Sequence, residues 1–370
     1  MKNMGSIAKT FVIMGLVAIL PHKVSLGQVG NTGELLRGSM QDAEILVTEY
    51  INPYASGLGA LTNTGFITSG RTHKLLGFDI SARVSATIIP SKYETFSLLE
   101  LPLNNLRPSA GNAAITSTVS GPDRRGPTVE VFERITLGDG TQTDYVITSF
   151  EMPSGSGFGY ALAPMVQLGV GVPLNTDVII RFMPTISIED YGDFNIIGFG
   201  INHDIKQWLD ADLPFNLSVM GGYTRIGLNG GFLLRPGAGE YDTDPGNVDR
   251  DVTWQGQKAL LTSTAWNFNL IIGKSIPFLN VYAGIGVQQS NFNVSFDGTF
   301  PVYNLVLDEM QNPIIELGTI MEPFEVNIDS GAVFRAMAGF SVKLGPIKLV
   351  GDITHADFLI LNAGVAISIR

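Results

Sequence analysis

Apolar and polar side chains alternate along several stretches of this chain. Between residues 78 and 89 an apolar side chain falls at almost every second position, and polar side chains occupy the positions between them. Alternation with this period predicts a β-strand with one apolar and one polar face. The pattern predicts ten strands, at residues 77–89, 160–172, 176–188, 194–203, 214–226, 260–274, 279–294, 331–344, 346–353 and 358–370.

The stretch 128–151 predicts one further hairpin. Two alternating runs, "TVEVFERITL" and "TDYVITSF", flank the turn-forming residues "GDGTQ". This hairpin either joins the other strands, which makes twelve, or projects from them, and the pattern leaves both arrangements open. Both counts are even, as expected when the two chain ends of a barrel lie on the same side.

The links between strands distinguish a membrane barrel from a soluble sandwich, since the strands of both classes have one apolar and one polar face. If successive strands run up and down, the short links lie at one end and the long links at the other. The short links are 173–176, 203–214, 275–277 and 345–346. The opposite end carries the links 90–159, 227–259, 295–331 and 354–358, and a short exception near 191–193. This asymmetry predicts an all-β fold, an antiparallel transmembrane β-barrel of about 10–14 strands.

A short helix precedes the strands. Ser39 and Asp42 form a start resembling a capping box, apolar residues share one helix face as far as Tyr50, and Pro53 ends the pattern. The glycine-rich stretch 52–70 follows, and it lacks the third glycine and the strand–helix context of a nucleotide site. We therefore expect a compact, irregular segment packed closely against other backbone.

The N-terminal residues have the pattern of an export signal. Lys2 and Lys9 precede the apolar run 11–20, which is too short to span a bilayer but is typical of a secretory signal ending near Gln28. No run of about 18–20 apolar residues follows, which excludes a helical membrane protein. The chain contains no cysteine, which excludes disulfides and a lipid-modified N-terminal cysteine. We therefore expect the protein in the outer membrane, in contact with membrane lipid.

The negative charge is concentrated in two predicted loops. Residues 239–251 carry five acids and one arginine, and residues 297–329 carry seven acids and no basic residue. Their combined charge of −11 equals that of the whole chain, so nucleic acid is not an expected partner. Solvated outer loops, able to bind a protein partner, are expected here in preference to a Ca²⁺ site, because the EF-hand pattern is missing.

Catalytic patterns are scarce. His73, His203 and His355 are far apart and show no metal-binding spacing, and the chain has no GxSxG motif and no cysteine nucleophile. The sequence therefore predicts no enzymatic activity, no cofactor and no metal site.

The polar strand faces supply candidates for the barrel interior. These lumen-facing candidates are Asp79, Arg83, Arg181, Asn216, Asn267, Asn269, Arg335, Lys343, Asp352 and Asn362. Such a set either closes into hydrogen-bonded pairs or lines a polar passage. In the link 203–214, His203, Asp204 and Trp208 are expected in a periplasmic turn, with the indole at the membrane–water interface.

Three segments carry a resemblance: "DAEILVTEYINPYASGLGALTNTGFITSGRTHKLLGFDISA", "APMVQLGVGVPLNTDVIIRFMP" and "GFGINHDIKQWL". They resemble an uncharacterised family of outer-membrane β-barrels from Bacteroidota. The layout is more distantly similar to the long-chain fatty-acid transporter family, whose barrel holds an N-terminal plug. On that resemblance residues 28–75, which include the helix, form a lumen plug between the signal peptide at 1–27 and the barrel at 76–370. The implied plug glycines are Gly57, Gly59, Gly65 and Gly70.

Two functions fit these expectations. The leading prediction is passive, porin-like uptake of a small hydrophobic molecule, with the plug as gate. The alternative is a non-transporting barrel that serves as a structural anchor or as a partner of a secretion or surface-display machine. A side opening or an apolar pocket beneath the plug favours the first, and a lumen filled by paired Arg, Lys and Asp favours the second.

Overall fold

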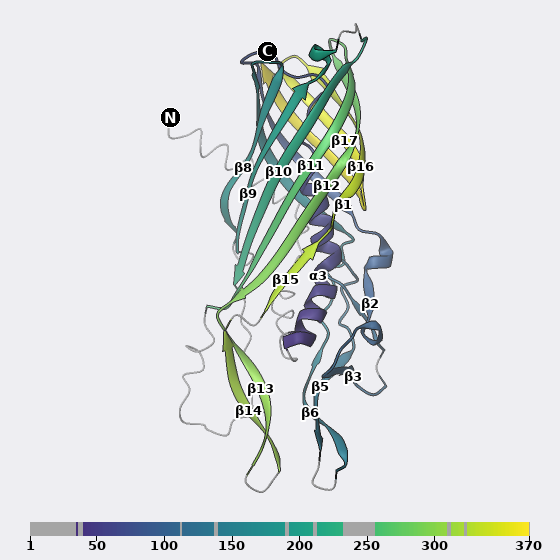
Figure 1. Cartoon of the computed structure of the whole chain (residues 1–370), viewed down its shortest axis with the longest axis vertical. Helices are drawn as coiled ribbons and strands as arrows, with labels where there is room; N and C mark the ends of the chain where they lie inside the picture. Colours follow the sequence, from purple (N-terminus) through teal and green to yellow (C-terminus); the bar gives the residue numbers. More distant parts are fainter. Residues whose placement is uncertain are drawn as a thin grey trace.

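The computed structural model describes residues 35, 40–111, 113–136, 140–188, 192–209, 213–231, 256–308, 312–321 and 324–369. Ten antiparallel strands close into a barrel (Figure 1). They are β1 (Phe78–Ile88), β7 (Tyr160–Val172), β8 (Thr176–Ile188), β9 (Gly192–Asp204), β10 (Asn216–Gly231), β11 (Lys258–Ser275), β12 (Leu279–Asp297), β16 (Val333–Leu344), β17 (Ile347–His355) and β18 (Leu359–Ile369). The predicted all-β barrel is confirmed, and each predicted strand coincides with one of these ten.

The barrel is closed by hydrogen bonding between neighbouring strands. The first strand, β1, pairs with β7 on one side and with the last strand, β18, on the other. The remaining strands pair in chain order, and β12 joins β11 to β16. Pro184 coincides with a shift of register between Met183 and Ile186 in β8, as expected of a residue without a backbone donor.

Alternation decides which face of the wall is buried. In β1, Asp79 and Ser81 are buried inside the barrel, whereas Ile80 points outward and is half exposed. The same arrangement recurs around the wall, where aromatic and aliphatic side chains such as Phe182 and Phe268 lie on the outer face. A one-residue slip would exchange the two faces, so the pattern fixes the register.

The two ends of the barrel differ as the link lengths predict. The end with the tight links, here called the turn end, lies at the top of Figure 1, and the loop end lies at the bottom. At the turn end, Leu174 and Asn175 turn between β7 and β8 with positive φ. Two of the predicted features, the signal peptide and the acidic stretch 239–251, lie outside the described residues.

The N-terminal helix is longer than predicted. Helix α3 spans Met40–Thr62 and continues through Pro53 and the first glycines, so the predictions of an end at Pro53 and of an irregular segment from residue 52 are wrong. The reason is tertiary packing, since the second half of α3 is enclosed by the barrel. A Cβ atom at Gly59 would lie 2.3 Å from Oγ of Ser290 in β12, so a larger residue would keep the helix off the wall. No helix of the described residues is long and apolar enough to cross a membrane.

The long links carry structure of their own. One contains β2 (Thr95–Ser97) paired with β4 (Ile115–Ser117), and the three-stranded sheet β3 (Leu106–Pro108), β5 (Thr128–Thr136) and β6 (Gln142–Glu151). Another contains the hairpin β13 (Thr299–Leu307) and β14 (Pro313–Met321), followed by β15 (Glu325–Asp329), which pairs with β12 beyond β16.

These elements settle the open question about residues 128–151, whose hairpin projects from the loop end and does not join the barrel (Figure 1). The β13–β14 hairpin was not predicted. The N-terminal half of α3 packs with the loop-end elements in one apolar core, which includes Leu46, Val47, Leu98, Val129 and Phe300. We call α3 up to Leu46 together with β2–β6 and β13–β15 the loop-end assembly.

Candidate functional site

The candidate site is the barrel interior, which contains part of the N-terminal chain. Helix α3 begins at the loop end, where the carboxylate of Asp42 accepts hydrogen bonds from the backbone N–H groups of Asn104 and Asn105. The helix then runs into the barrel, and the chain leaves at the turn end to begin β1 (Figure 1). We call residues 57–73, which contact the inward face of the wall, the luminal segment.

Three buried arginines of the wall bind the backbone of this segment. Arg181 in β8 donates to the carbonyl oxygen of Thr62 at 2.9 Å and to that of Thr64. Arg335 in β16 donates to the carbonyl of Asn63 at 2.7 Å, and Arg83 in β1 donates to that of Ile67 at 2.9 Å. We call Arg83, Arg181 and Arg335 the arginine cluster.

The arginine cluster lies where α3 ends. The last four carbonyls of a helix lack helical partners and carry the negative end of its dipole. Here each one finds a donor: Gly59 from the Thr62 hydroxyl, Ala60 and Leu61 from the following turn, and Thr62 from Arg181. Arg181 therefore stabilises the last carbonyl of a buried helix terminus, and Arg335 and Arg83 bind carbonyls of the residues that follow it.

Phe66 fits into a notch of the wall. A Cβ atom at Gly222 of β10 would lie 2.6 Å from Cζ of the Phe66 ring, and one at Gly200 of β9 would lie 2.8 Å from its Cδ1. The guanidinium of Arg181 lies over the ring, 3.4 Å from its centre, and Gln167 donates to the Phe66 carbonyl at 2.9 Å. The two glycines thus leave room for the Phe66 ring. Arg181 and Gln167 fix the position of Phe66 by a cation–π contact and a hydrogen bond.

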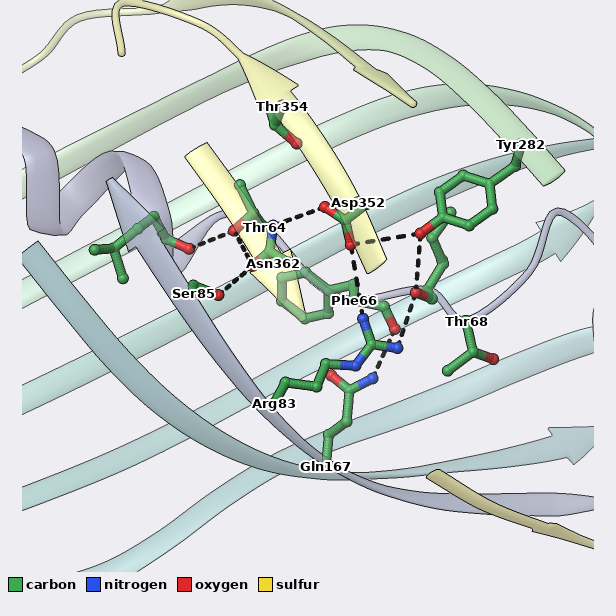
Figure 2. A network of polar contacts seen from close by, with 12 residues as sticks. Thr64, Phe66, Thr68, Arg83, Ser85, Gln167, Tyr282, Asp352, Thr354 and Asn362 are labelled. Carbon is green, nitrogen blue, oxygen red and sulfur yellow. Dashed lines mark hydrogen bonds and ion pairs between the residues drawn. The ribbon is translucent and has the colours of Figure 1, made fainter. Parts of the chain in front are cut away.

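A polar network joins Arg83 of the arginine cluster to β17 and β18 (Figure 2). Asp352 lies 3.9 Å from Arg83 and accepts hydrogen bonds from Asn362, at 2.7 Å, and from the Tyr282 hydroxyl, at 3.4 Å. Thr64 of the luminal segment donates to Asn362 at 3.0 Å. The segment and four wall strands therefore share one polar network.

His73 makes a second connection, near the turn end. Its Nε2 lies 3.3 Å from Asp79 of β1, its Nδ1 lies 3.2 Å from Asp177 of β8, and its backbone N–H donates to Asp177 at 2.8 Å. Each ring nitrogen of His73 therefore faces a carboxylate, and Lys348 adds a cation 3.5 Å from Asp79.

Little free space is left beside this connection. The cavity bordered by His73, Asp79, Gln167 and Asn202 has a volume of about 10 Å³, enough for a single water molecule. Among the described residues, no group of three or more His, Cys, Asp or Glu side chains is placed to hold a metal ion.

The structure places all ten lumen-facing candidates on the inward face of the wall. Eight are buried there: Asp79, Arg83, Arg181, Asn267, Asn269, Arg335, Asp352 and Asn362. Asn216 and Lys343 lie in the same inward alternation, half-buried towards the turn end, where Asn216 donates to Ser275.

The four glycines predicted for a plug all lie in the luminal segment. Gly57 and Gly59 are in α3, Gly65 has a φ of +72°, and a Cβ atom at Gly70 would lie 2.8 Å from Cα of Gly273 in β11.

The predicted turn residues lie together at the turn end. His203 and Asp204 end β9, and Trp208 lies in the short helix η4 (Lys206–Trp208) with its indole 63% exposed. The indole N–H of Trp208 donates to Nε2 of His203 at 2.9 Å, which leaves Nδ1 of His203 to donate to Thr176 at 2.7 Å. These residues lie apart from the luminal segment and form a turn stabilised by its own hydrogen bonds.

Sequence reasoning missed the partners of the luminal segment. His73 was treated as an isolated histidine, and Gln167 and Tyr282 were not singled out as candidates. The alternation places Asp79 and Asp177 on the inward faces of their strands. Because His73 lies close to Asp79 in the sequence, these two inward acids could have indicated the contact with His73. The carbonyl groups bound by the arginines give no signal in a sequence.

Comparison with known proteins gives the family. The chain belongs to the family of unknown function DUF6588. The match covers residues 1–369 and confirms an uncharacterised family, while the Bacteroidota origin and the likeness to fatty-acid transporters stay predictions. Comparison with curated proteins gives no match.

Solved structures resemble this DUF6588 member only remotely. The attachment invasion locus protein Ail of Yersinia pestis has 6% identity and a TM-score of 0.25, with 80% of this chain and 100% of Ail covered. The transport unit of the autotransporter AIDA-I from Escherichia coli has 9% identity and a TM-score of 0.27, with 87% and 98% covered. The translocator domain of NalP from Neisseria meningitidis has 11% identity and a TM-score of 0.25, with 81% and 90% covered. At these scores the architecture rests on the strand pairing of the chain itself.

Proposed function

We propose that this protein is a closed outer-membrane barrel that anchors the loop-end assembly on the cell surface, without enzymatic activity. In this orientation the turn end is periplasmic and the loop end is extracellular, as short turns and long loops suggest. The barrel then supplies the membrane anchor, and α3 connects it to the assembly outside.

The observation that carries this proposal is the occupied interior. Wall side chains hydrogen-bond to the luminal segment at Thr62, Asn63, Thr64, Phe66 and Ile67. A segment fixed at so many successive residues supports a permanent structural role more than an open passage. The Arg, Lys and Asp side chains of the lumen contribute two further pairs, Arg83 with Asp352 at 3.9 Å and Lys348 with Asp79 at 3.5 Å.

Two measurements on the intact protein test this role. Reconstituted into liposomes, the wild type is expected to give no swelling with small sugars, whereas an open porin measured in parallel gives rapid swelling. Protease added to intact cells is expected to cut the assembly and leave the barrel protected. Swelling comparable to that of the porin would contradict closure, and a protease-resistant assembly that is cut only in broken cells would contradict surface display.

The loop-end assembly is the expected docking site for a protein partner. Its acidic stretch 297–329 includes Asp297, Glu325 and Asp329, of which Asp329 accepts hydrogen bonds from Gln289. A partner that presents basic side chains would be attracted by this charge.

A second candidate function is the uptake of a small hydrophobic molecule, and one observation favours it. An open groove of about 670 Å³ lies on the wall at Gly339 and Gly351, bordered by apolar side chains such as Phe340 and Leu361. However, β16 and β17 remain paired over nine residues beside it, so the groove does not interrupt the wall hydrogen bonds. Mass spectrometry of an organic extract of the natively purified protein tests this function. Enrichment of one apolar compound over an unrelated barrel would support uptake, and no enrichment would argue against an occupied groove.

A further inference from the structure

The arginine cluster has a chemistry that the anchoring role does not use. Arg83, Arg181 and Arg335 project from three different strands, and each is at most 3% exposed. Arg181 is close enough to Arg83 and Arg335 for their charges to repel one another. Three buried guanidinium groups that all contact residues 62–67 would be costly to bury without compensating negative charge.

Most of that compensation comes from the luminal segment and not from the wall. The acceptors of the cluster include four backbone carbonyls, those of Thr62, Asn63, Thr64 and Ile67. Among the described residues, the one carboxylate within ion-pair distance of the cluster is Asp352, 3.9 Å from Arg83. The segment therefore occupies the position of a counter-anion, using carbonyl dipoles in place of a full charge.

The cluster also retains unused donor capacity. Nε of Arg83 and Nε of Arg335 are buried and have no hydrogen-bond partner in the described part of the chain. A guanidinium group presents its N–H donors in a planar fork that fits the oxygens of phosphate, sulfate or a carboxylate. An oxyanion at this position could accept hydrogen bonds that the carbonyl groups leave unmade.

The wall does not depend on the luminal segment for closure. All ten strands pair with their neighbours through backbone hydrogen bonds, and β1 pairs with β18 along eleven residues. Beyond residue 73 the segment joins β1 through an exposed turn that contains Lys74, Leu75 and Leu76. If the segment is displaced, the barrel keeps its shape and the arginines face the emptied lumen.

We propose that the arginine cluster is an anion-selective filter with an oxyanion-binding site, which the luminal segment keeps occupied and closed. Once the segment is displaced, the lumen passes small anions, rejects cations and binds inorganic phosphate or sulfate at the cluster. The reason is that a narrow lining with a net positive charge concentrates anions and repels cations. This goes beyond the anchoring role, which requires only that the undisturbed barrel is closed.

The test uses the full chain with a protease recognition sequence in place of the exposed residues 74–76. After refolding and insertion into a planar bilayer with asymmetric KCl, protease cuts the turn and mild urea releases the segment. Currents are expected to appear after cutting, with a reversal potential that indicates an about tenfold preference for chloride over potassium. Inorganic phosphate is expected to reduce the chloride current at millimolar concentration, while uncut protein in the same urea stays closed.

Two charge variants make the test specific. In the cut protein, Arg335→Glu is expected to shift selectivity towards potassium and to weaken the block by phosphate, and Arg335→Gln to do so to a smaller degree. The control Arg134→Glu removes an exposed arginine of β5 at the loop end and is expected to leave both properties unchanged. Cation preference, unchanged selectivity in Arg335→Glu, or no current after cutting would each overturn the proposal. None of these results depends on whether the uncut protein anchors an assembly at the cell surface.

Discussion

Phe66 and His73 hold the luminal segment by two different kinds of contact. Phe66 depends on shape, because its ring occupies space that Gly200 and Gly222 leave free. His73 depends on charge, because its ring lies between the carboxylates of Asp79 and Asp177. Each contact therefore responds to a different perturbation, and each can be tested separately.

The Phe66 notch predicts a difference between two adjacent glycines. In Gly222→Val the new side chain points into the lumen and meets the Phe66 ring, so we expect a loss of about 1–3 kcal/mol of unfolding free energy. In Gly221→Val it points outward, where the nearest atoms lie 3.9 Å or more from a Cβ, and little change is expected. Urea unfolding of the refolded proteins measures both. Equal stability of the two variants would show that Phe66 does not occupy the notch.

His73 predicts a loss of stability when its ring is removed. The ring lies between the carboxylates of Asp79 and Asp177, with Lys348 beyond Asp79. His73→Ala leaves both buried carboxylates without this partner, so we expect a loss of about 1–3 kcal/mol of unfolding free energy. His355→Ala, which changes an exposed residue, is expected to leave the urea midpoint as in the wild type. Equal urea midpoints for the two variants would refute this role of His73.

Helix α3 belongs to two parts of the molecule. Its first half packs in the apolar core of the loop-end assembly, and its second half is enclosed by the barrel. The strands of the wall, in contrast, are held by pairing with one another. A substitution in the apolar core around the first half of α3 is therefore expected to destabilise the loop-end assembly and to leave the barrel intact.

Leu46 tests that separation. Leu46→Ala removes a fully buried side chain from the loop-end core, and we expect a loss of about 2–5 kcal/mol in the stability of the assembly. Limited proteolysis should then cut the assembly much faster than in the wild type, while the barrel still resists unfolding by detergent without heating. Met40→Ala, at an exposed position of the same helix, serves as the control. Loss of the barrel together with the assembly would contradict the separation.

At the scale of elements, the strands could be predicted and the segments between them could not. Strand positions follow from alternation, which is local in the sequence. The course of α3 beyond Pro53 depends on packing against Ser290, more than two hundred residues away, which overrides the local preference of proline and glycine. The β13–β14 hairpin was hidden in a stretch singled out for its acidic residues. The arginines could be assigned to the lumen, but their partners are backbone carbonyls that any sequence would supply.

For the whole molecule, the direction of the N-terminal chain is the central feature. The luminal segment enters the barrel from the loop end and leaves at the turn end, so the start of α3 and the start of β1 lie on opposite sides (Figure 1). Met40 and Leu75 mark these two ends, and both side chains are at least half exposed. If the barrel is a surface anchor, Met40 faces the outside of the cell and Leu75 faces the periplasm.

The absence of cysteine from the chain makes this arrangement directly measurable. Met40→Cys and Leu75→Cys are produced separately, and intact cells are treated with a maleimide that does not cross the outer membrane. The account predicts labelling of Met40→Cys on intact cells and labelling of Leu75→Cys only after the cells are broken. Labelling of Leu75→Cys alone, or of neither variant until lysis, would contradict a barrel that anchors its loop-end assembly at the cell surface.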